Sequence, residues 1–220
     1  MTPSFIPYSP RFYSEEELLD RTRLFFQTFN QRRSVRQFSE KPIPIEVIEN
    51  LIKTAGSAPS GANKQPWTFV VVSDPKLKHK IRIATEQIEK SFYEQRISDE
   101  WRQDLVPLGT DWQKPFLEDA PYLIVVFQQN YRIDSQGRKR KHYYVIKSVG
   151  IAVGFLIMAI HNAGLVTVPH TPSPMSFLRE ILGRPKNEKA FVILPVGYPI
   201  ENAQVPNIKR KKLTDILVWK

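Results

Sequence analysis

The chain of 220 residues contains no cysteine. This absence excludes disulfide bonds, thiolate metal ligands and cysteine nucleophiles together. Histidine is also scarce, and the four histidines are scattered without the spacing of metal ligands: His79, His142, His161 and His170. If the protein carries out redox chemistry, the electrons must therefore reside on a bound cofactor.

Several common site motifs are missing from the sequence. There is no GxGxxG after a strand, no GxxxxGK[ST], no HExxH and no GxSxG. These absences weigh against Rossmann-type nicotinamide binding, P-loop hydrolysis, zinc chemistry and hydrolysis at a nucleophile elbow.

Long apolar segments are lacking as well. Residues 1–10 are polar and rich in proline, unlike a secretory signal, and the longest apolar run, Val149–Ile160, is shorter than the roughly 20 residues of a membrane span. We expect a soluble, cytoplasmic protein with no membrane association. Gly150 and Gly154 within this run indicate either close helix packing at a subunit interface or a tight contact inside one core.

Positive charge is abundant: the formal net charge is +10 and the isoelectric point is near 9.7. The basic residues are spread along the chain, with short clusters at 138–141 and 209–212. Because most basic clusters are solvated surface, we expect no nucleic-acid partner. The excess charge suits an anionic cofactor, since guanidinium groups match phosphate geometry.

The remaining composition, 41% hydrophobic and 25% charged, is that of one soluble globular domain. Ser14 and Glu17 form a capping-box pattern, which predicts a helix to about residue 29 with Leu18, Leu24 and Phe25 among its buried positions. Further helices are predicted over 44–56, 74–97, 144–163 and 175–182, and strands over 67–72, 122–127, 166–168 and 191–196. Residues 98–115 are expected to be mobile and partly helical, and 132–141 to form a basic loop. The pattern indicates an α+β or an α/β architecture in layers.

Two segments carry the groups that an anionic planar cofactor needs. The run Arg32-Arg33-Ser34-Val35-Arg36 is a possible phosphate site or simply a charged turn. The run from Pro59 to Trp67 contains Gly61, which permits close backbone approach to a ligand, and otherwise reads as a helix-to-strand connection.

Taken in order, RRSVR, PSGANKQPWTFVVV, HNAGLVTVPHTP, LGRP and LPVGYP resemble the signature of the FMN-dependent nitroreductase superfamily. The resemblance covers residues 31–212, leaving residues 1–30 as an N-terminal arm and helix and 213–220 as a C-terminal extension. It implies an α+β sandwich with a central mixed sheet flanked by helices. It also implies an intertwined homodimer with two FMN molecules in the interface, each held by both subunits.

The resemblance also implies cofactor contacts for particular residues. Arg32, Arg33, Ser34 and Arg36 match positions that hold the FMN phosphate, ribityl chain and pyrimidine edge, and Arg210 matches a late phosphate-binding arginine. Pro59, Ser60, Gly61 and Asn63 match the loop that crosses the flavin from the partner subunit. Thr171 matches a catalytic threonine whose hydroxyl faces flavin N5.

Within the superfamily, KHKIR followed by Glu89, Tyr93 and Lys114 is similar to the lid of the iodotyrosine deiodinase branch. The implied lid covers about residues 89–115 and grips an aromatic amino acid, with Glu89 on the ammonium and Lys114 and Tyr93 on the carboxylate. Ala62 matches the residue whose backbone N–H meets the substrate phenolate. A generic nitroreductase needs no such pair of charges.

The sequence departs from the branch at two places. Pro169 and His170 stand where the deiodinases have threonines before the position of Thr171, and Asn63 and Gln65 resemble the wider nitroreductase pattern.

Three functions follow as hypotheses. The first is FMN-dependent reductive dehalogenation of halotyrosines by a soluble, bacterial-type homologue. The second is a broad nitroreductase or quinone reductase using NAD(P)H, and the electron donor of the first is either NAD(P)H or a separate reductase. The third is a non-catalytic flavin- or nucleic-acid-binding protein.

Overall fold

The computed structural model describes residues 3–220. The chain divides into two compact units, one up to Arg32 and one from Arg33 onward. The division falls beside the predicted boundary between the N-terminal arm and the main domain. Each unit is described by itself.

The first unit contains one helix, α1 (Glu15–Asn30). The Glu17 N–H donates to Ser14 Oγ at 3.2 Å, and the Ser14 N–H donates to Glu17 Oε2 at 2.8 Å, so the predicted capping box is confirmed. The predicted burial of Leu18, Leu24 and Phe25 is wrong, because they are 49%, 65% and 55% exposed. Residues 3–32 form no second helix or strand against which this apolar stripe could pack.

The second unit is built on a four-stranded sheet in the order β1-β2-β6-β5. The strands are β1 (Trp67–Val72), β2 (Tyr122–Gln129), β5 (Val166–Thr167) and β6 (Glu188–Gly197). All three ladders between them are antiparallel. Among residues 3–220, a single parallel bridge joins Ser34 to Thr167. It is the parallel pairing that gives this sheet the mixed parallel and antiparallel character predicted from the sequence.

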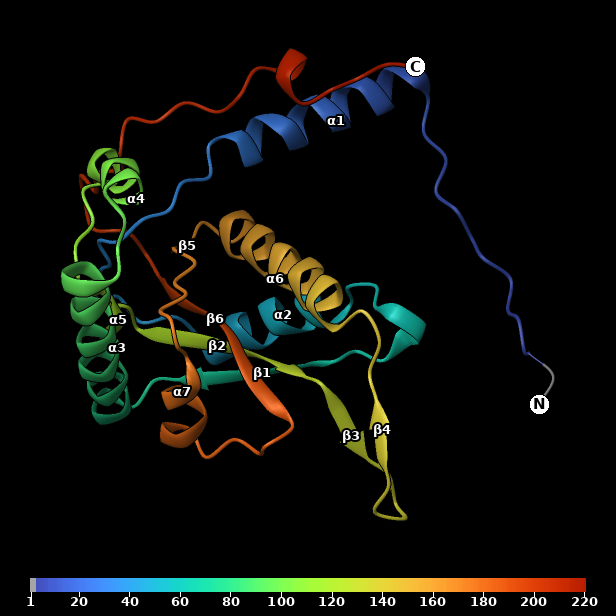
Figure 1. Cartoon of the computed structure of the whole chain (residues 1–220). Coiled ribbons are helices and arrows are strands. Elements are labelled where there is room, and N and C mark those ends of the chain that lie inside the picture. Colours follow the sequence, from blue (N-terminus) through green and yellow to red (C-terminus); the bar gives the residue numbers. More distant parts are fainter. Residues whose placement is uncertain (1–2) are drawn as a thin grey trace. The chain divides into compact units, whose positions relative to one another are not determined.

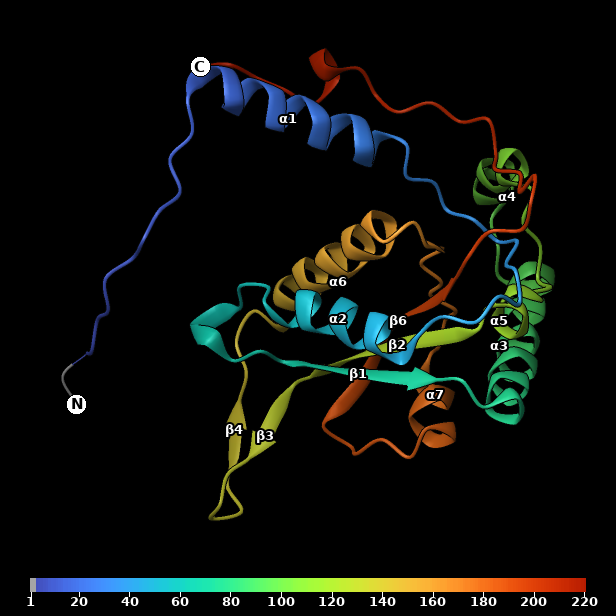
Figure 2. The same cartoon turned by 180° about the vertical axis from the view of Figure 1, so that it is seen from behind.

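Helices cover both faces of this sheet (Figures 1 and 2). One face packs against α2 (Ile45–Gly56) and α6 (Val145–Asn162), and the other against α3 (Pro75–Gln95), α5 (Phe116–Asp119) and α7 (Ser176–Ile181). Along β2, Ile124 and Val126 enter the first core, while Leu123 and Val125 enter the second. Burial on both faces explains why this strand is continuously apolar rather than alternating.

The other predicted helices and strands are also found, with ends shifted by a few residues. Residues 98–115 contain α4 (Asp99–Leu105) and the short helix η2 (Val106–Leu108), as expected for a partly helical segment. The loop predicted at 132–141 is instead a hairpin of β3 (Tyr131–Ile133) and β4 (Lys139–Lys141). Its turn forms because the Asp134 carboxylate accepts backbone N–H groups from Gln136 and Arg138 at 3.0 and 2.9 Å. Two further short helices are η1 (Gly61–Asn63) and η3 (Leu213–Asp215).

Helix α6 is longer than the apolar run identified in the sequence, and its 18 residues meet the length and composition of a membrane span. It nevertheless packs as a core helix against α2, β2 and β5 and buries Val149, Leu156 and Ile160, among others. Gly150 and Gly154 lie on its exposed side, where nothing lies within 4 Å of an added Cβ. The interpretation that these glycines make a tight contact inside one core is therefore wrong. The other interpretation, close helix packing at a subunit interface, stays a prediction.

A substitution at Gly197, at the end of β6, tests how closely this strand packs against Pro121 and against Phe38, which lies two residues after the RRSVR segment. An added Cβ would lie 2.8 Å from Pro121 Cδ and 2.9 Å from Phe38 Cδ1. We expect Gly197→Ala to lower the free energy of unfolding in urea by about 1–3 kcal/mol, as overpacking does. Gly56→Ala is the control, because its Cβ meets nothing within 4 Å. Equal stability of Gly197→Ala and wild type would contradict the close approach.

Candidate active site

The RRSVR segment is held in extended conformation beside β5 and the chain after β6. The Val35 N–H donates to Thr167 O at 3.2 Å, and the Ser39 N–H donates to Tyr198 O at 2.8 Å. The Arg33 guanidinium donates to Pro206 O. Val35 is buried, whereas Ser34 and Arg36 are half-buried. These contacts fix the backbone from which Arg36 reaches the lid.

Helix α3 and the loop between η2 and α5 bring the three predicted substrate residues together. Glu89 and Tyr93 are four residues apart on α3 and so share one face. The Lys114 ammonium lies 3.4 Å from Glu89 Oε2 and 5.5 Å from the centre of the Tyr93 ring. The Tyr93 hydroxyl donates to Thr110 O at 3.4 Å.

Lys114 is the most unusual charge in this group because it is only 3% exposed. Its ammonium donates to Asp111 O and, at 3.4 Å, to Thr110 Oγ1, in addition to the ion pair with Glu89. Burial lowers the pKa of Lys114, and the Glu89 carboxylate opposes that shift. Burial likewise raises the pKa of Tyr93 and lowers that of Arg36. The segment predicted to form a lid thus pairs, within itself, the two charges that were predicted to bind a zwitterion.

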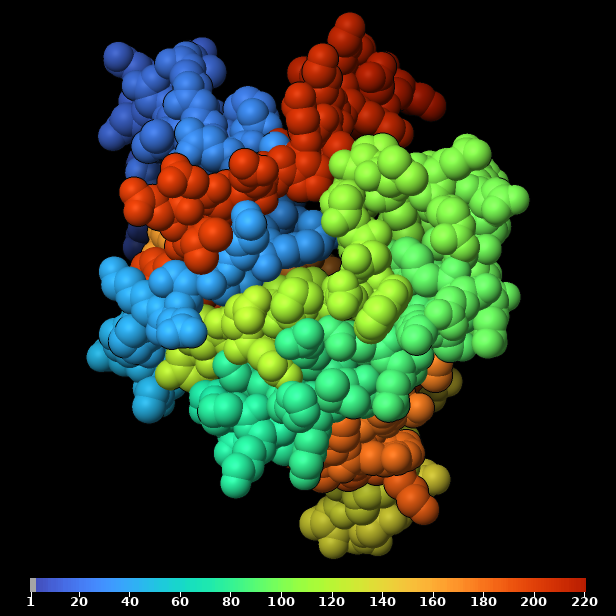
Figure 3. All heavy atoms as spheres, turned by 90° about the vertical axis from the view of Figure 1, so that its left-hand side faces the viewer, coloured from blue at the N-terminus to red at the C-terminus, as the bar shows by residue number. Residues whose placement is uncertain are grey.

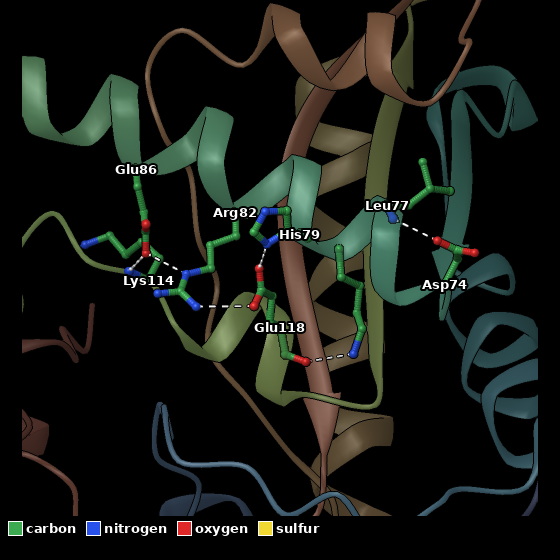
Figure 4. Close-up of polar contacts among 8 residues, drawn as sticks. Asp74, Leu77, His79, Arg82, Glu86, Lys114 and Glu118 are labelled. Carbon is green, nitrogen blue, oxygen red and sulfur yellow. Dashed lines mark hydrogen bonds and ion pairs between the residues drawn. The ribbon is translucent and has the colours of Figure 1, made fainter.

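A polar network anchors the root of the lid to α3 (Figure 4). Glu86 Oε1 accepts from the Lys114 N–H at 2.7 Å and from Arg82 Nε at 2.8 Å. Arg82 also donates to Glu118 at 3.3 Å, and His79 Nδ1 lies 2.6 Å from the same carboxylate. In Figure 3 the green atoms of α3 and α4 gather on one side of the face shown. Sequence reasoning missed Glu86, whose only signal was an Arg–Glu pair at i,i+4.

His170 is a second residue that sequence reasoning noted only as a departure. Its backbone exchanges two hydrogen bonds of 2.9 Å with Ile193, and its ring meets Phe116 edge-on at 5.6 Å between centroids. Its Nε2 atom is buried and has no hydrogen-bond partner among residues 3–220. Burial lowers the pKa of His170 to about 3, with further lowering from the charges of Lys114 and Arg36. The imidazole is therefore neutral at ordinary pH.

Thr171 follows His170 directly and is exposed. It borders a cavity of about 660 Å³ between the start of α7 and the start of β6, whose lining includes Asn130, Met175 and Arg179. Arg36, Lys114 and His170 do not line this cavity, so the structure connects the predicted catalytic threonine to them only through its chain neighbour His170.

The predicted loop Pro59–Asn63 forms a separate group at the N-terminus of α6. Ala62 and Asn63 both have φ of 49°, a left-handed conformation that non-glycine residues rarely adopt. The Gly61 N–H donates to Ser148 Oγ at 3.2 Å, and an added Cβ on Gly61 would lie 2.8 Å from the Tyr144 ring. Strained backbone of this kind is concentrated at functional sites. Here it changes the direction of the backbone N–H groups in the short helix η1.

The two groups lie at opposite ends of β1 (Figures 1 and 2). The loop with Ala62 precedes this six-residue strand and α3 follows it, so they are separated by about 20 Å of strand. One chain does not bring Ala62 together with Glu89 and Lys114. Of the other predicted cofactor residues, Arg32 ends the first unit and Arg210 lies in the exposed C-terminal segment.

Comparison with known proteins agrees with this layered architecture. The sequence model of the nitroreductase family matches residues 30–198. The chain belongs to the nitroreductase family.

Its relatives place it more narrowly. It is 56% identical over 216 residues to an iodotyrosine deiodinase of Haliscomenobacter hydrossis, covering 98% of this chain and 97% of that one. It is 51% identical to an iodotyrosine deiodinase of Hydra vulgaris, covering 97% of this chain and 79% of that one. A crystal structure of oxidised iodotyrosine deiodinase bound to FMN and 3-iodo-L-tyrosine matches with a TM-score of 0.76 and 35% identity, covering 86% of this chain and 96% of that one. Within the family, the chain falls in the iodotyrosine deiodinase branch.

The buried imidazole of His170 predicts a specific pH dependence. The unfolded chain takes up a proton near the ordinary pKa of 6.5, but the folded chain does so only near 3. The contribution of His170 to stability is therefore complete above about pH 6.5 and is lost as the pH falls toward 3. Between pH 7 and 4.5, the wild type should lose about 2 kcal/mol more free energy of unfolding than His170→Phe, as measured in urea.

Other titrating groups are common to both proteins, and their effect cancels in this difference. The charged groups that act on His170, Arg36 and Lys114, stay protonated throughout the range. Parallel pH profiles for the wild type and the variant would show that His170 is not held neutral by the fold.

Proposed function

We propose that this protein is an FMN-dependent oxidoreductase that removes halogen from halotyrosines. The observation that carries the proposal is the ion pair between the buried Lys114 and the half-buried Glu89, 3.4 Å apart in the predicted lid. A buried ion pair is costly unless both charges are well compensated. A free amino acid carries one ammonium and one carboxylate group. Its ammonium can pair with Glu89 and its carboxylate with Lys114, so the internal ion pair can open without leaving either charge unpaired.

The residues present fit FMN as the cofactor. Arg33, Ser34 and Arg36 supply donors along one extended segment, and Arg210 and Arg32 supply further positive charge for a phosphate. The Pro59–Gly61 loop, with Asn63, provides a small residue and turned backbone N–H groups for close approach. When bound, FMN would supply the two electrons that, with one proton, convert the carbon–halogen bond into a carbon–hydrogen bond and a halide ion. An arginine near its pyrimidine edge stabilises the negative charge of the reduced form.

In this proposal each protein group has a limited task. Glu89 binds the substrate ammonium, while Lys114 and the Tyr93 hydroxyl bind the carboxylate. The Ala62 N–H donates to the phenolate oxygen, and the Thr171 hydroxyl makes a hydrogen bond at flavin N5. Binding of the zwitterion orders the lid over the ring and excludes water, which couples substrate recognition to closure.

The active protein is a homodimer in this proposal. Ala62 and Lys114 lie on opposite ends of β1, so both can reach one ligand only if two subunits contribute. The exposed side of α6 supports the same view, because Ile146, Ile151 and Phe155 on it are 67%, 44% and 37% exposed. The exposed apolar residues of α1 are consistent with a partner as well.

We further propose a cytoplasmic enzyme that needs neither membrane nor nucleic acid and is reduced by NAD(P)H or a separate reductase. The alternative, a broad nitroreductase or quinone reductase using NAD(P)H, shares the cofactor but not the clamp. Nothing in that chemistry uses the Glu89–Lys114 pair, so the halotyrosine proposal explains more of the site.

Glu89→Gln tests the clamp. We expect the dissociation constant of 3-iodotyrosine to rise by at least roughly tenfold, because a charge-assisted contact to the ammonium is lost, while FMN stays bound. The measurement is quenching of flavin fluorescence, with FMN content read from absorbance. Glu94→Gln is the control, since Glu94 is exposed and pairs only with Lys90 at 3.9 Å.

Unchanged affinity of Glu89→Gln would refute the clamp, and loss of FMN from this variant would assign Glu89 a structural role. Equal binding of 4-nitrophenol and 3-iodotyrosine by the wild type would favour the alternative reductase. A colourless wild type that cannot be reloaded with FMN would refute both enzymes.

Phe155→Glu tests the dimer. A charge placed in the buried contact between two α6 helices should convert the dimer into a monomer in sedimentation velocity and release FMN with it. Ile133→Glu, on the hairpin and 53% exposed in wild type, should remain dimeric. A monomeric wild type that holds FMN would contradict the shared site.

A further inference from the structure

His170 is fixed in place more firmly than a surface loop residue. Its backbone N–H and C=O both bond to Ile193 of β6, and its ring packs edge-on against Phe116 of α5. The imidazole therefore has a defined position between the sheet and the lid root. A polar group held this way either has a partner or leaves its hydrogen-bonding capacity unused.

The second case holds for the His170 ring among residues 3–220. Nε2 of His170 is buried and makes no hydrogen bond to any described residue. Leaving a buried polar group unpaired costs free energy, so such groups in native proteins call for an explanation. A second histidine shows what a satisfied one looks like here: His142 is 5% exposed, and its Nδ1 lies 3.0 Å from Gln129 O.

The two charged groups that act on His170 are both positive. Arg36 and Lys114 both lie close enough for their positive charges to lower its pKa. Lys114 is compensated by Glu89 at 3.4 Å, but a ligand ammonium would draw that carboxylate away. A negatively charged group arriving between the two cations would then be stabilised by both, and a neutral imidazole N–H could add a hydrogen bond to it.

We propose that His170 is a ligand-binding residue whose Nε2–H donates a hydrogen bond to an anionic group bound between Arg36 and Lys114. The inference rests on the proposed function. The anion has two possible sources with the same chemistry, the carboxylate of the amino-acid substrate and the negatively charged pyrimidine edge of reduced FMN.

His170→Phe and His170→Gln separate hydrogen bonding from packing. Phenylalanine keeps a planar ring against Phe116 but has no nitrogen, whereas glutamine keeps an N–H donor but not the ring. His142→Phe is the matched control, because it makes the same substitution at the histidine that is satisfied by Gln129. Its expected effect is a lower melting temperature with unchanged ligand binding.

Three quantities are measured on the FMN-loaded proteins. They are the dissociation constant of 3-iodotyrosine, that of 3-iodotyramine, which lacks the carboxylate, and the midpoint potential of the flavin. If the anion is the carboxylate, His170→Phe weakens 3-iodotyrosine roughly tenfold and leaves 3-iodotyramine unchanged. If it is the pyrimidine edge, His170→Phe makes the midpoint potential more negative and leaves both dissociation constants unchanged.

His170→Gln should recover part of whichever property His170→Phe loses. If His170→Phe matches the wild type in both dissociation constants and in midpoint potential, the inference is wrong and His170 only packs. It is also wrong if both His170 variants change nothing but the melting temperature, as His142→Phe does. A wild type that binds neither FMN nor 3-iodotyrosine overturns the proposed function itself, a result that is visible before any variant is made.

Discussion

The burial of one ammonium group, that of Lys114, sets the constraints on the lid. A charge that is 3% exposed requires compensation, and helix α3 contacts this residue through two carboxylates. Glu89 pairs with the side chain, while Glu86 holds the backbone N–H of the same residue. Glu86 is in turn held by Arg82, which also reaches Glu118 at the far side of the lid root. The position of the lid therefore depends on α3 being continuous from Arg82 to Tyr93.

The sheet imposes a second constraint, on where the two halves of the candidate site can lie. Its central strands are buried on both faces, so ligand-binding groups are confined to the ends of strands and the loops beyond them. The Pro59–Asn63 loop and the lid occupy opposite ends of β1. In the homodimer that we propose, each subunit supplies half of each site, and the exposed apolar side of α6 is the surface on which the two subunits meet. Left-handed backbone at Ala62 and Asn63 concentrates strain in the half that would cross to the partner.

His142 and His170 illustrate how the same residue type acquires different roles. Both are immobilised by backbone pairing nearby, but only His142 has a protein acceptor for its ring. The surroundings of His170 contain two cations and an aromatic edge, which together keep it neutral. Neutrality suits the anion-binding role that we propose, because His170 can then donate a hydrogen bond without adding a third positive charge to the site.

The sequence by itself determined most of the secondary structure of the main domain, the family, and the candidate residues of the predicted lid. Capping residues, glycine stops and apolar runs act locally, and the ordered motifs from Arg32 to Tyr198 are distinctive without coordinates. It also located Glu89 and Tyr93 on one helix face, since i,i+4 spacing is a property of the helix alone. Only the tertiary structure decided that Leu18, Leu24 and Phe25 are exposed, that residues 131–141 form a hairpin, and that Glu86 and His170 join the lid cluster. Each of these depends on which segments, distant in sequence, come to lie within a few ångströms, and neither periodicity nor motif spacing carries that information.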